Sequence, residues 1–152
     1  MKTEIVYEDQ DILICHKPAG LATQSASVSQ PDVVSELKKY LGGGYLGIVH
    51  RLDQPVEGLL VFARNKKAAA ELGRQLTQGI LQKRYCALVY GQPPQESGRL
   101  VDYLRKEGSL SKVVPEGTSE AQKAVLQYRI RQAGGRTAAG GQSNGSVTHG
   151  GA

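Results

Sequence analysis

The sequence is poor in aromatic residues and in cysteine, and each shortage excludes a class of structure. None of its 152 residues is tryptophan, one is phenylalanine and two are cysteine. Without a ladder of aromatic side chains, a platform that holds single strands by base stacking is not expected. Cys15 and Cys86 lie far apart without a metal-binding spacing, which predicts two reduced, buried thiols and no disulfide or zinc site.

Long apolar runs are missing as well. No segment approaches the ~18 apolar residues that a membrane span needs. The opening MKTEIVYEDQ lacks the basic start and the apolar stretch of a signal peptide. We therefore expect a soluble, cytoplasmic protein without a membrane partner, and its length fits one domain of ordinary size.

The sequence does contain an excess of positive charge. Nineteen Lys and Arg residues stand against fourteen Asp and Glu residues, which leaves a formal net charge of +5. This balance favours a polyanionic partner such as RNA, DNA or an acidic surface.

Hydrophobic periodicity predicts a mixture of strands and helices, which is typical of the α+β class. One helix is expected to begin at Pro31 and to end at glycines 42–44, and a second to span 66–77 with Asn65 as its N-cap. The expected strands are residues 4–7, 11–16, 46–52, 58–64, 83–91 and 123–131. The strand at 83–91 carries apolar or aromatic residues on both faces, which predicts that it is covered on both sides.

The strand at 123–131 has a different pattern. Its apolar residues alternate with polar and basic ones, namely Lys123, Gln127, Arg129 and Arg131. This alternation predicts one face towards the core and a basic face towards water or a ligand.

The last twenty residues, AGGRTAAGGQSNGSVTHGGA, hold seven glycines and a single large aliphatic residue, Val147. Such a segment cannot bury enough surface to offset the entropy of ordering it. We therefore predict a folded domain over residues 1–136 and a disordered, glycine-rich tail over 137–152.

Two groups of residues can be compared with known ligand sites. GGGYLG at 42–47 has the letters of a dinucleotide-binding loop, but it follows a helix and precedes a strand, so a helix stop is predicted. His16, His50 and Asp53 lack the spacing of metal ligands. The sequence therefore predicts neither a metal nor a cofactor.

Asp53 is the residue that most needs an explanation. It stands in HRLDQPVEGLLVFARN, residues 50–65, just before an apolar strand. One interpretation is an ion pair with Arg51 beside a turn. The other is a carboxylate held for chemistry, because Pro55 keeps the preceding residue extended and Gly58 lets a ligand approach closely. A carboxylate fixed in this way is pre-organised as a nucleophile or general base.

Three segments together resemble the RluA-type RNA pseudouridine synthases. HRLDQPVEGLLVFARN resembles the family's H-R-L-D signature, EDQDILICHKPAGL its acidic turn, strand and K-P-x-G, and LQKRYCALVYG its K-x-Y-x-A-x-V-x-G strand. The three motifs stand in family order, and the resemblance runs from about residue 4 to about residue 136. It implies a pseudouridine synthase catalytic fold with a mixed, mainly antiparallel central sheet.

The resemblance also implies an activity and the roles of single residues. Asp53 corresponds to the catalytic aspartate that attacks the target nucleoside, so that uracil detaches, turns and rejoins the ribose through carbon. Tyr85 corresponds to the tyrosine that packs against the target base, and Arg51 to the arginine that helps to hold the RNA after the uridine has swung out. The family uses no cofactor or metal.

The implied partner is a structured RNA, rRNA or tRNA, with a uridine that can be extruded, and the chain is expected to act as a monomer. The basic candidates for contact with that RNA are His50, Lys17, Arg64, Lys83 and Arg84.

The sequence departs from the family in two places. Val56 and Glu57 stand where Thr-Ser is usual. After residue 136 the family's G-R-x-H-Q-I-R segment, whose basic residue pairs with the catalytic carboxylate, has no counterpart. The resemblance therefore predicts a sheet that is incomplete at the C-terminus, with an unpaired edge beside Ala124–Ile130. It leaves two hypotheses, an active synthase and a catalytically inactive RNA-binding remnant.

Overall fold

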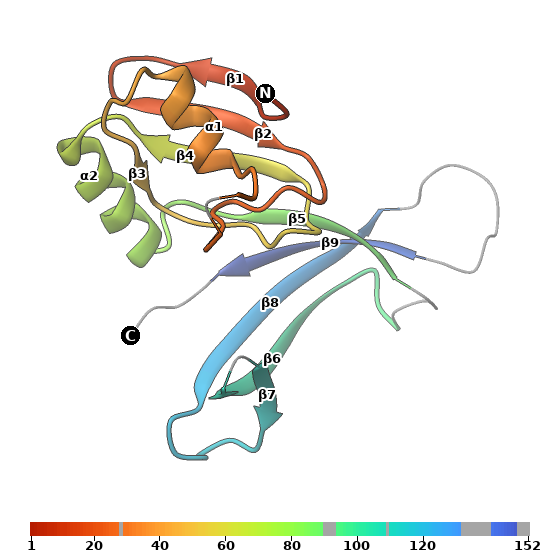
Figure 1. Cartoon of the computed structure of the whole chain (residues 1–152). Helices are drawn as coiled ribbons and strands as arrows, with labels where there is room; N and C mark the ends of the chain where they lie inside the picture. Colours follow the sequence, from red (N-terminus) through yellow and green to blue (C-terminus); the bar gives the residue numbers. More distant parts are fainter. Residues whose placement is uncertain (28, 90–93, 109, 132–140, 149–152) are drawn as a thin grey trace. The chain divides into compact units, whose positions relative to one another are not determined.

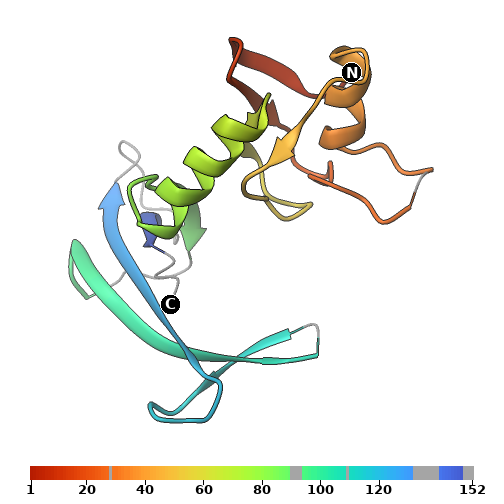
Figure 2. The same ribbon diagram turned by 90° about the vertical axis from the view of Figure 1, so that its left-hand side faces the viewer.

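The computed structural model describes residues 1–27, 29–89, 94–108, 110–131 and 141–148. The chain divides into two compact units, residues 1–74 and 75–152. Figures 1 and 2 show the elements of both. The predicted α+β class is confirmed, since two helices accompany sheets whose named strands all pair antiparallel in the described part of the chain.

The first unit is built on a four-stranded sheet with the order β1-β2-β4-β3. Its strands are β1 (Glu4–Glu8), β2 (Ile12–Lys17), β3 (Gly47–Ile48) and β4 (Gly58–Ala63). β1, β2 and β4 lie where the sequence predicted strands. The prediction for 46–52 was too long, because only two of those residues pair with β4.

One face of this sheet carries the core. Alternate residues of β2 and β4 are buried there, namely Leu13, Cys15, Leu60 and Phe62. Helix α1 (Val33–Tyr40) contributes the buried side chains of Val33, Val34 and Leu37 and lies against the sheet in Figure 1. Strand alternation and helical spacing thus place apolar residues on facing surfaces.

Both helices begin at a side-chain cap. The α1 cap is Asp32, whose Oδ1 accepts a hydrogen bond from the Ser35 backbone N–H at 2.7 Å, so the helix starts two residues after the predicted Pro31. Helix α2 (Lys66–Thr77) has the predicted bounds, and Asn65 caps it by accepting from the Ala68 N–H at 2.8 Å.

The second unit is a five-stranded antiparallel sheet with the order β5-β9-β8-β6-β7. Its strands are β5 (Arg84–Val89), β6 (Ser97–Glu107), β7 (Leu110–Val114), β8 (Gln122–Arg131) and β9 (Gly141–Thr148). β5 and β8 were predicted. β6 and β7 were missed, because neither strand has an alternate row of purely apolar residues.

Two predictions about burial on β5 were wrong. Arg84, Cys86 and Ala87 are exposed, so the strand is not covered on both sides, and Cys86 is not a buried thiol. Apolar alternation on both faces shows that a strand could be covered, but only the neighbouring elements decide whether it is.

The C-terminal segment also differs from the prediction. Residues 141–148 form β9, where a disordered tail over 137–152 was predicted. β9 pairs with β5 on one side and with β8 on the other, so the edge of β8 expected to be open is occupied over Val125–Arg131. Pairing uses backbone groups only, and a glycine-rich strand can fill a gap between two others without apolar side chains. Residues 137–140 and 149–152 lie outside the described residues.

Candidate active site

Asp53 lies on a tight turn between β3 and β4. The Val56 N–H donates to the Asp53 carbonyl at 3.0 Å and closes the turn over Gln54 and Pro55. The Asp53 side chain is exposed, while its neighbour Leu52 is buried. The buried Leu52 side chain therefore anchors the backbone beside Asp53 in the core, while the Asp53 carboxylate faces solvent.

Thr23 fixes the residue before Asp53. This threonine is buried, its Oγ1 donates to the Leu52 carbonyl at 2.7 Å, and it accepts from the Leu52 N–H at 3.1 Å. One hydroxyl thus satisfies both backbone groups of Leu52. The sequence gave no signal for this contact, because Thr23 is 29 positions from Leu52.

The residue after Asp53 is held by the segment that resembles K-P-x-G. The Gly20 N–H donates to the Gln54 carbonyl at 2.8 Å, and Gln54 Nε2 donates to the Gly20 carbonyl at 3.0 Å. Gly20 has φ +84, a left-handed conformation that glycine adopts without strain. The two sides of Asp53 are therefore pinned by residues 20–23.

Lys17 completes this support from inside the unit. Its side chain is fully buried, and Nζ donates to the carbonyls of Leu21 at 2.6 Å, Gln54 at 3.1 Å and Pro18 at 3.2 Å. Burial lowers the pKa of Lys17, while the carboxylates of Asp53 and Glu57 act in the opposite direction. In this structure the three donors of Lys17 point at backbone carbonyls and not at solvent, where the predicted contact with RNA phosphate would need them.

Arg51 does not form the ion pair considered from the sequence. Its Nη2 donates to Gln24 Oε1 at 2.8 Å, and no ion pair within the described residues joins it to Asp53. Arg51 stands two residues before Asp53 and is exposed. Its partner, the Gln24 side chain, carries no charge. The purely structural explanation of Asp53 thus loses its main support.

A histidine–glutamate pair lies beside the turn. His16 Nε2 is 3.1 Å from Glu57 Oε1, so the end of β2 is linked to the residue that stands at the family's usual serine position. His50, another RNA candidate, accepts the Val61 N–H through Nε2 at 3.2 Å. That bond gives His50 a role in holding β4 beside the Asp53 segment.

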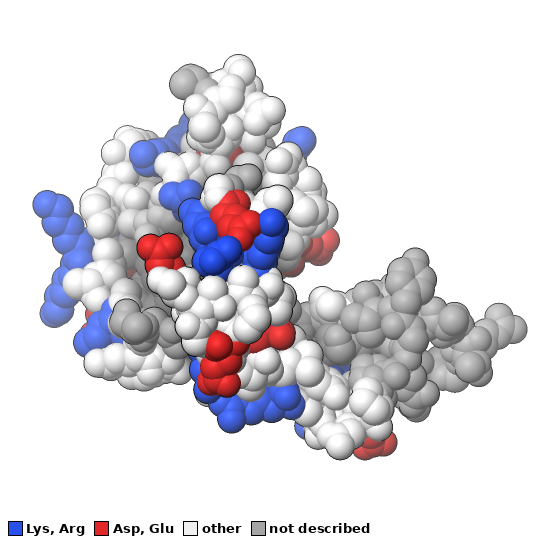
Figure 3. Space-filling view, turned by 90° about the horizontal axis from the view of Figure 1, so that it is seen from below, with Lys and Arg blue, Asp and Glu red and all other residues white. Residues whose placement is uncertain are grey.

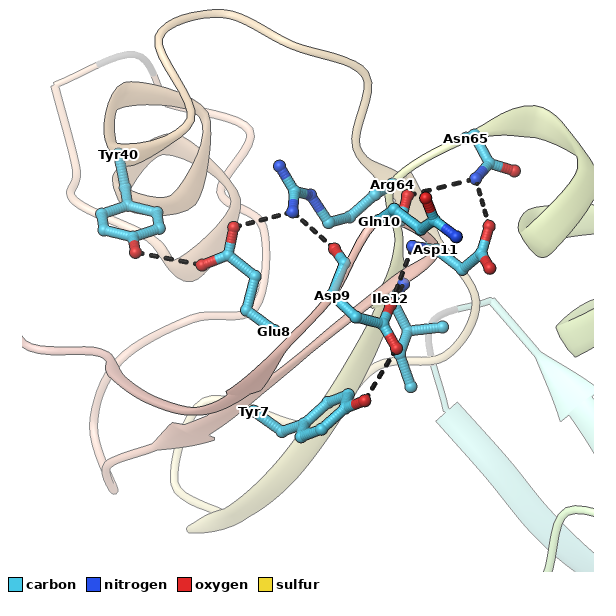
Figure 4. Close-up of polar contacts among 9 residues, drawn as sticks. All are labelled: Tyr7, Glu8, Asp9, Gln10, Asp11, Ile12, Tyr40, Arg64 and Asn65. Atoms are coloured by element: carbon cyan, nitrogen blue, oxygen red, sulfur yellow. Dashed lines mark hydrogen bonds and ion pairs between the residues drawn. The ribbon is translucent and has the colours of Figure 1, made fainter.

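Arg64 belongs to a polar network at the β1–β2 turn, which Figure 4 shows in close-up. Its Nη1 is 2.8 Å from Glu8 Oε1 and also donates to the Asp9 carbonyl. Tyr40 donates to the other oxygen of Glu8 at 3.0 Å. Nη1 of Arg64 thus serves contacts within the unit, and a contact of Arg64 with RNA phosphate stays a prediction.

Tyr85, Lys83 and Arg84 belong to the second unit. Arg84 and Tyr85 are the first two residues of β5, and Lys83 directly precedes it. Arg84 is exposed, while Tyr85 and Lys83 are half-buried. Consecutive strand residues point to opposite faces, so Arg84 and Tyr85 do not share a face of their sheet.

Among the described residues, no group of three or more His, Cys, Asp and Glu side chains is arranged to hold a metal ion. No helix within those residues is long and apolar enough to cross a membrane.

Comparison with known proteins places this fold in the pseudouridine synthase class. The family model described as RNA pseudouridylate synthase matches residues 11–147. The human protein RNA Pseudouridylate Synthase Domain Containing 4 has the same fold, with a TM-score of 0.77 at 21% identity over 97% of this chain and 59% of that one.

Two curated relatives are similar in sequence. Ribosomal large subunit pseudouridine synthase C of Rickettsia bellii is 34% identical over 129 residues, 83% of this chain and 42% of that protein. Dual-specificity RNA pseudouridine synthase RluA of Vibrio vulnificus is 37% identical over 64% of this chain and 39% of that protein. The chain thus belongs to the RNA pseudouridylate synthase family, to its RluA type, and spans less than half the length of these relatives.

Proposed function

We propose that this chain carries the catalytic aspartate of an RNA pseudouridine synthase, and that Asp53 is the nucleophile. The observation that supports this most is the support of the Asp53 turn. Leu52 and Gln54 are each fixed by two hydrogen bonds to residues 20–23, while the carboxylate between them is exposed. A reactive group that is held in place and open to substrate is what covalent catalysis requires.

The reaction is an isomerisation, so all atoms of the nucleotide are kept. Attack by a carboxylate oxygen of Asp53 forms a covalent bond to the target nucleoside, and the glycosidic C–N bond of uridine breaks. The uracil turns, its C5 bonds to C1′ of the ribose, and the carboxylate is released. The proton on C5 leaves to solvent while N1 gains one. No oxidant, reductant or metal is needed to balance these steps.

The partner in this proposal is RNA with an extrudable uridine. The Rickettsia bellii relative is named for the ribosomal large subunit, which favours rRNA, and the name of the dual-specificity relative leaves more than one RNA class open. Arg51 would help to hold the extruded nucleotide, and Tyr85 would pack against its base. We further propose a monomer that acts in the cytoplasm.

A second candidate function is an RNA-binding protein without turnover. It is favoured by Val56 and Glu57, which stand where Thr-Ser is usual in the family and add a carboxylate to the turn of Asp53. Both candidate functions include RNA binding, but only the first includes isomerisation of uridine.

The decisive experiment replaces Asp53 with asparagine and measures tritium release from 5-tritiated uridine in a ribosomal RNA transcript. We expect Asp53→Asn to abolish release and to leave RNA affinity within about threefold, because it removes the nucleophile and one negative charge near phosphates. Asp102→Asn, an exposed aspartate on β6, is the matched control and should keep parent activity.

Parent-like release by the Asp53→Asn variant would overturn the assignment of the nucleophile. Absence of release from the unmodified chain, with RNA binding retained, would instead favour the second candidate.

A further inference from the structure

The register of the second sheet brings basic residues from four strands to one face. Arg99 of β6 pairs with Gln127 of β8, and Ser146 of β9 lies between Gln127 and Arg84 of β5. Residues at paired positions lie on the same face of an antiparallel sheet, and alternate residues along each strand share it. We call this surface the cationic face; its charged residues are Arg84, Arg99, Arg105, Glu107, Lys112, Lys123, Arg129 and Arg131.

Charge is distributed unequally between the two faces. Along the described parts of β5–β8, the cationic face carries seven Lys or Arg residues and one carboxylate, Glu107. The opposite face carries one cation, Lys106, and one carboxylate, Asp102. A solvated sheet usually mixes the two signs, so a one-sided arrangement of this size concentrates positive potential on one surface.

Most of these cations are available to a ligand. Glu107 pairs with Arg105 and with Lys112, each at 2.6 Å, and so occupies two of them. The others that are exposed and take part in none of the ion pairs within the described residues are Arg84, Arg99, Lys123, Arg129 and Arg131. In Figure 3, which views the protein from below, Lys and Arg side chains surround a small group of Asp and Glu side chains near the middle of the view.

The uncharged positions of the cationic face also suit a nucleic acid. Tyr103 lies beside Lys123 and Val114 and donates its hydroxyl to Glu116. Gln127 is exposed between Arg99 and the β9 strand. Amide and aromatic groups among cations can contact sugars and bases, whereas cations alone contact only phosphate.

We propose that the cationic face binds the sugar–phosphate backbone of the RNA substrate. The proposal rests on the proposed function for the nature of the partner and extends it to a second contact surface, away from the Asp53 turn in sequence. β5 ends the strand order of its sheet, so RNA that passes along this edge can reach both Arg84 on the cationic face and Tyr85 on the other.

The test compares two triple variants of the full chain with equal net charge. The first, Arg99→Gln/Lys123→Gln/Arg129→Gln, removes three cations from the cationic face. The control, Lys38→Gln/Lys39→Gln/Lys106→Gln, removes three exposed cations from α1 and from the opposite face of β6. A third variant, Arg99→Lys/Lys123→Arg/Arg129→Lys, keeps the charge. The probe is a fluorescein-labelled RNA hairpin with a uridine in its loop, and anisotropy gives Kd over a series of salt concentrations.

We expect the first variant to bind at least ~10-fold more weakly and to show a salt slope shallower by about 2–3, because each lost phosphate contact removes about 0.7–0.9 from the slope. The control and the charge-keeping variant should bind like the parent chain. Melting curves for all four proteins show whether the fold is kept.

Equal weakening in the first variant and the control would mean that net charge, and not this face, attracts RNA, and would overturn the proposal. Absence of RNA binding by the parent chain would overturn it as well. Tritium release measured in parallel separates this inference from the proposed function. Loss of binding in the first variant alone, with no isomerisation by any of the four proteins, would support the cationic face and count against catalysis.

Discussion

At the scale of single residues, Lys17 shows how a charge can serve the fold instead of the ligand. The sequence makes Lys17 a candidate for contact with RNA phosphate. In the structure its ammonium group is enclosed and donates to three backbone carbonyls, one of them from Gln54. A buried charge is tolerated only where such partners replace water. Lys17 therefore acts on Asp53 through the turn.

We predict that Lys17→Met destabilises the first unit by ~1–3 kcal/mol, because the Leu21 carbonyl loses its buried donor and those of Gln54 and Pro18 lose one of theirs. Urea unfolding followed by circular dichroism measures the effect. Lys66→Met, at the exposed first position of α2, is the control and should change stability by less than about 0.5 kcal/mol. Equal losses in the two variants would show that the buried ammonium contributes nothing specific.

The two cysteines should differ strongly in reactivity. Burial raises the pKa of the Cys15 thiol to about 12, so its reactive thiolate is populated only at strongly alkaline pH, whereas Cys86 is exposed. A thiol reagent at neutral pH should modify one thiol quickly in the native chain and both after unfolding. Cys86→Ser should remove the fast reaction and Cys15→Ser should not. Two equally fast thiols in the native chain would contradict the burial of Cys15.

At the scale of elements, the β6–β8 pair depends on a glycine. Gly98 lies opposite Tyr128, and a Cβ atom at position 98 would be 2.7 Å from Cε1 of the tyrosine ring. The ring therefore covers the place where another residue would have its side chain. Such aromatic cover compensates for the weakness of glycine in a strand.

We predict that Gly98→Ala lowers stability by about 1–3 kcal/mol, because the Tyr128 ring must leave its place and the gain in strand propensity is smaller. Thermal unfolding is the measurement. The double variant Gly98→Ala/Tyr128→Val should recover part of the loss, since it removes the clash. The control is Gly73 of α2, where no atom lies within 4 Å of an added Cβ. Gly117 also has open space, but its φ of +83 would strain an alanine there, so it does not serve as a control. Gly73→Ala should be neutral or stabilising.

At the scale of the whole molecule, the second unit depends on its last strand. β5 carries Arg84 and Tyr85. Among the described residues, β9 is the one strand that pairs with β5, and β9 also pairs with one edge of β8. A glycine-rich segment thus joins the strand with the proposed base-packing tyrosine to the remaining sheet. The sequence analysis predicted that this segment is disordered, whereas the structure shows a strand at Gly141–Thr148. An experiment can decide between a disordered tail and a paired strand.

We predict that ending the chain after residue 140 exposes the edges of β5 and β8 and makes the protein aggregate, because open edges pair with other chains. Hydrogen exchange at Arg84–Ala87 should become fast, and size-exclusion chromatography should show higher oligomers. The control ends the chain after Thr148 and should behave like the full protein. Unchanged protection at Arg84–Ala87 in the shorter chain would mean that β9 is not formed in solution.

The sequence alone predicted those features whose physical cause lies within a few neighbouring residues. The bounds of α2 followed from the Asn65 cap and Gly79, and β1, β2 and β4 followed from their alternation, because these signals lie within a few residues of the structure they specify. The position of Asp53 on a proline turn before a buried strand, and the family itself, followed from contiguous motifs in the same way.

Only the tertiary structure decided what surrounds those motifs. Thr23 clamps Leu52 from 29 positions away, and Lys17 reaches Gln54 from 37 positions away, so neither contact leaves a local pattern in the sequence. The same holds for the cationic face, which exists because strand register aligns Arg84, Arg99 and Arg129 from separate segments. The charge of a residue and the periodicity of a segment can be read from the sequence. Whether a side chain is buried, which group it bonds and which face of a sheet it shares depend on the distant segments that pack against it.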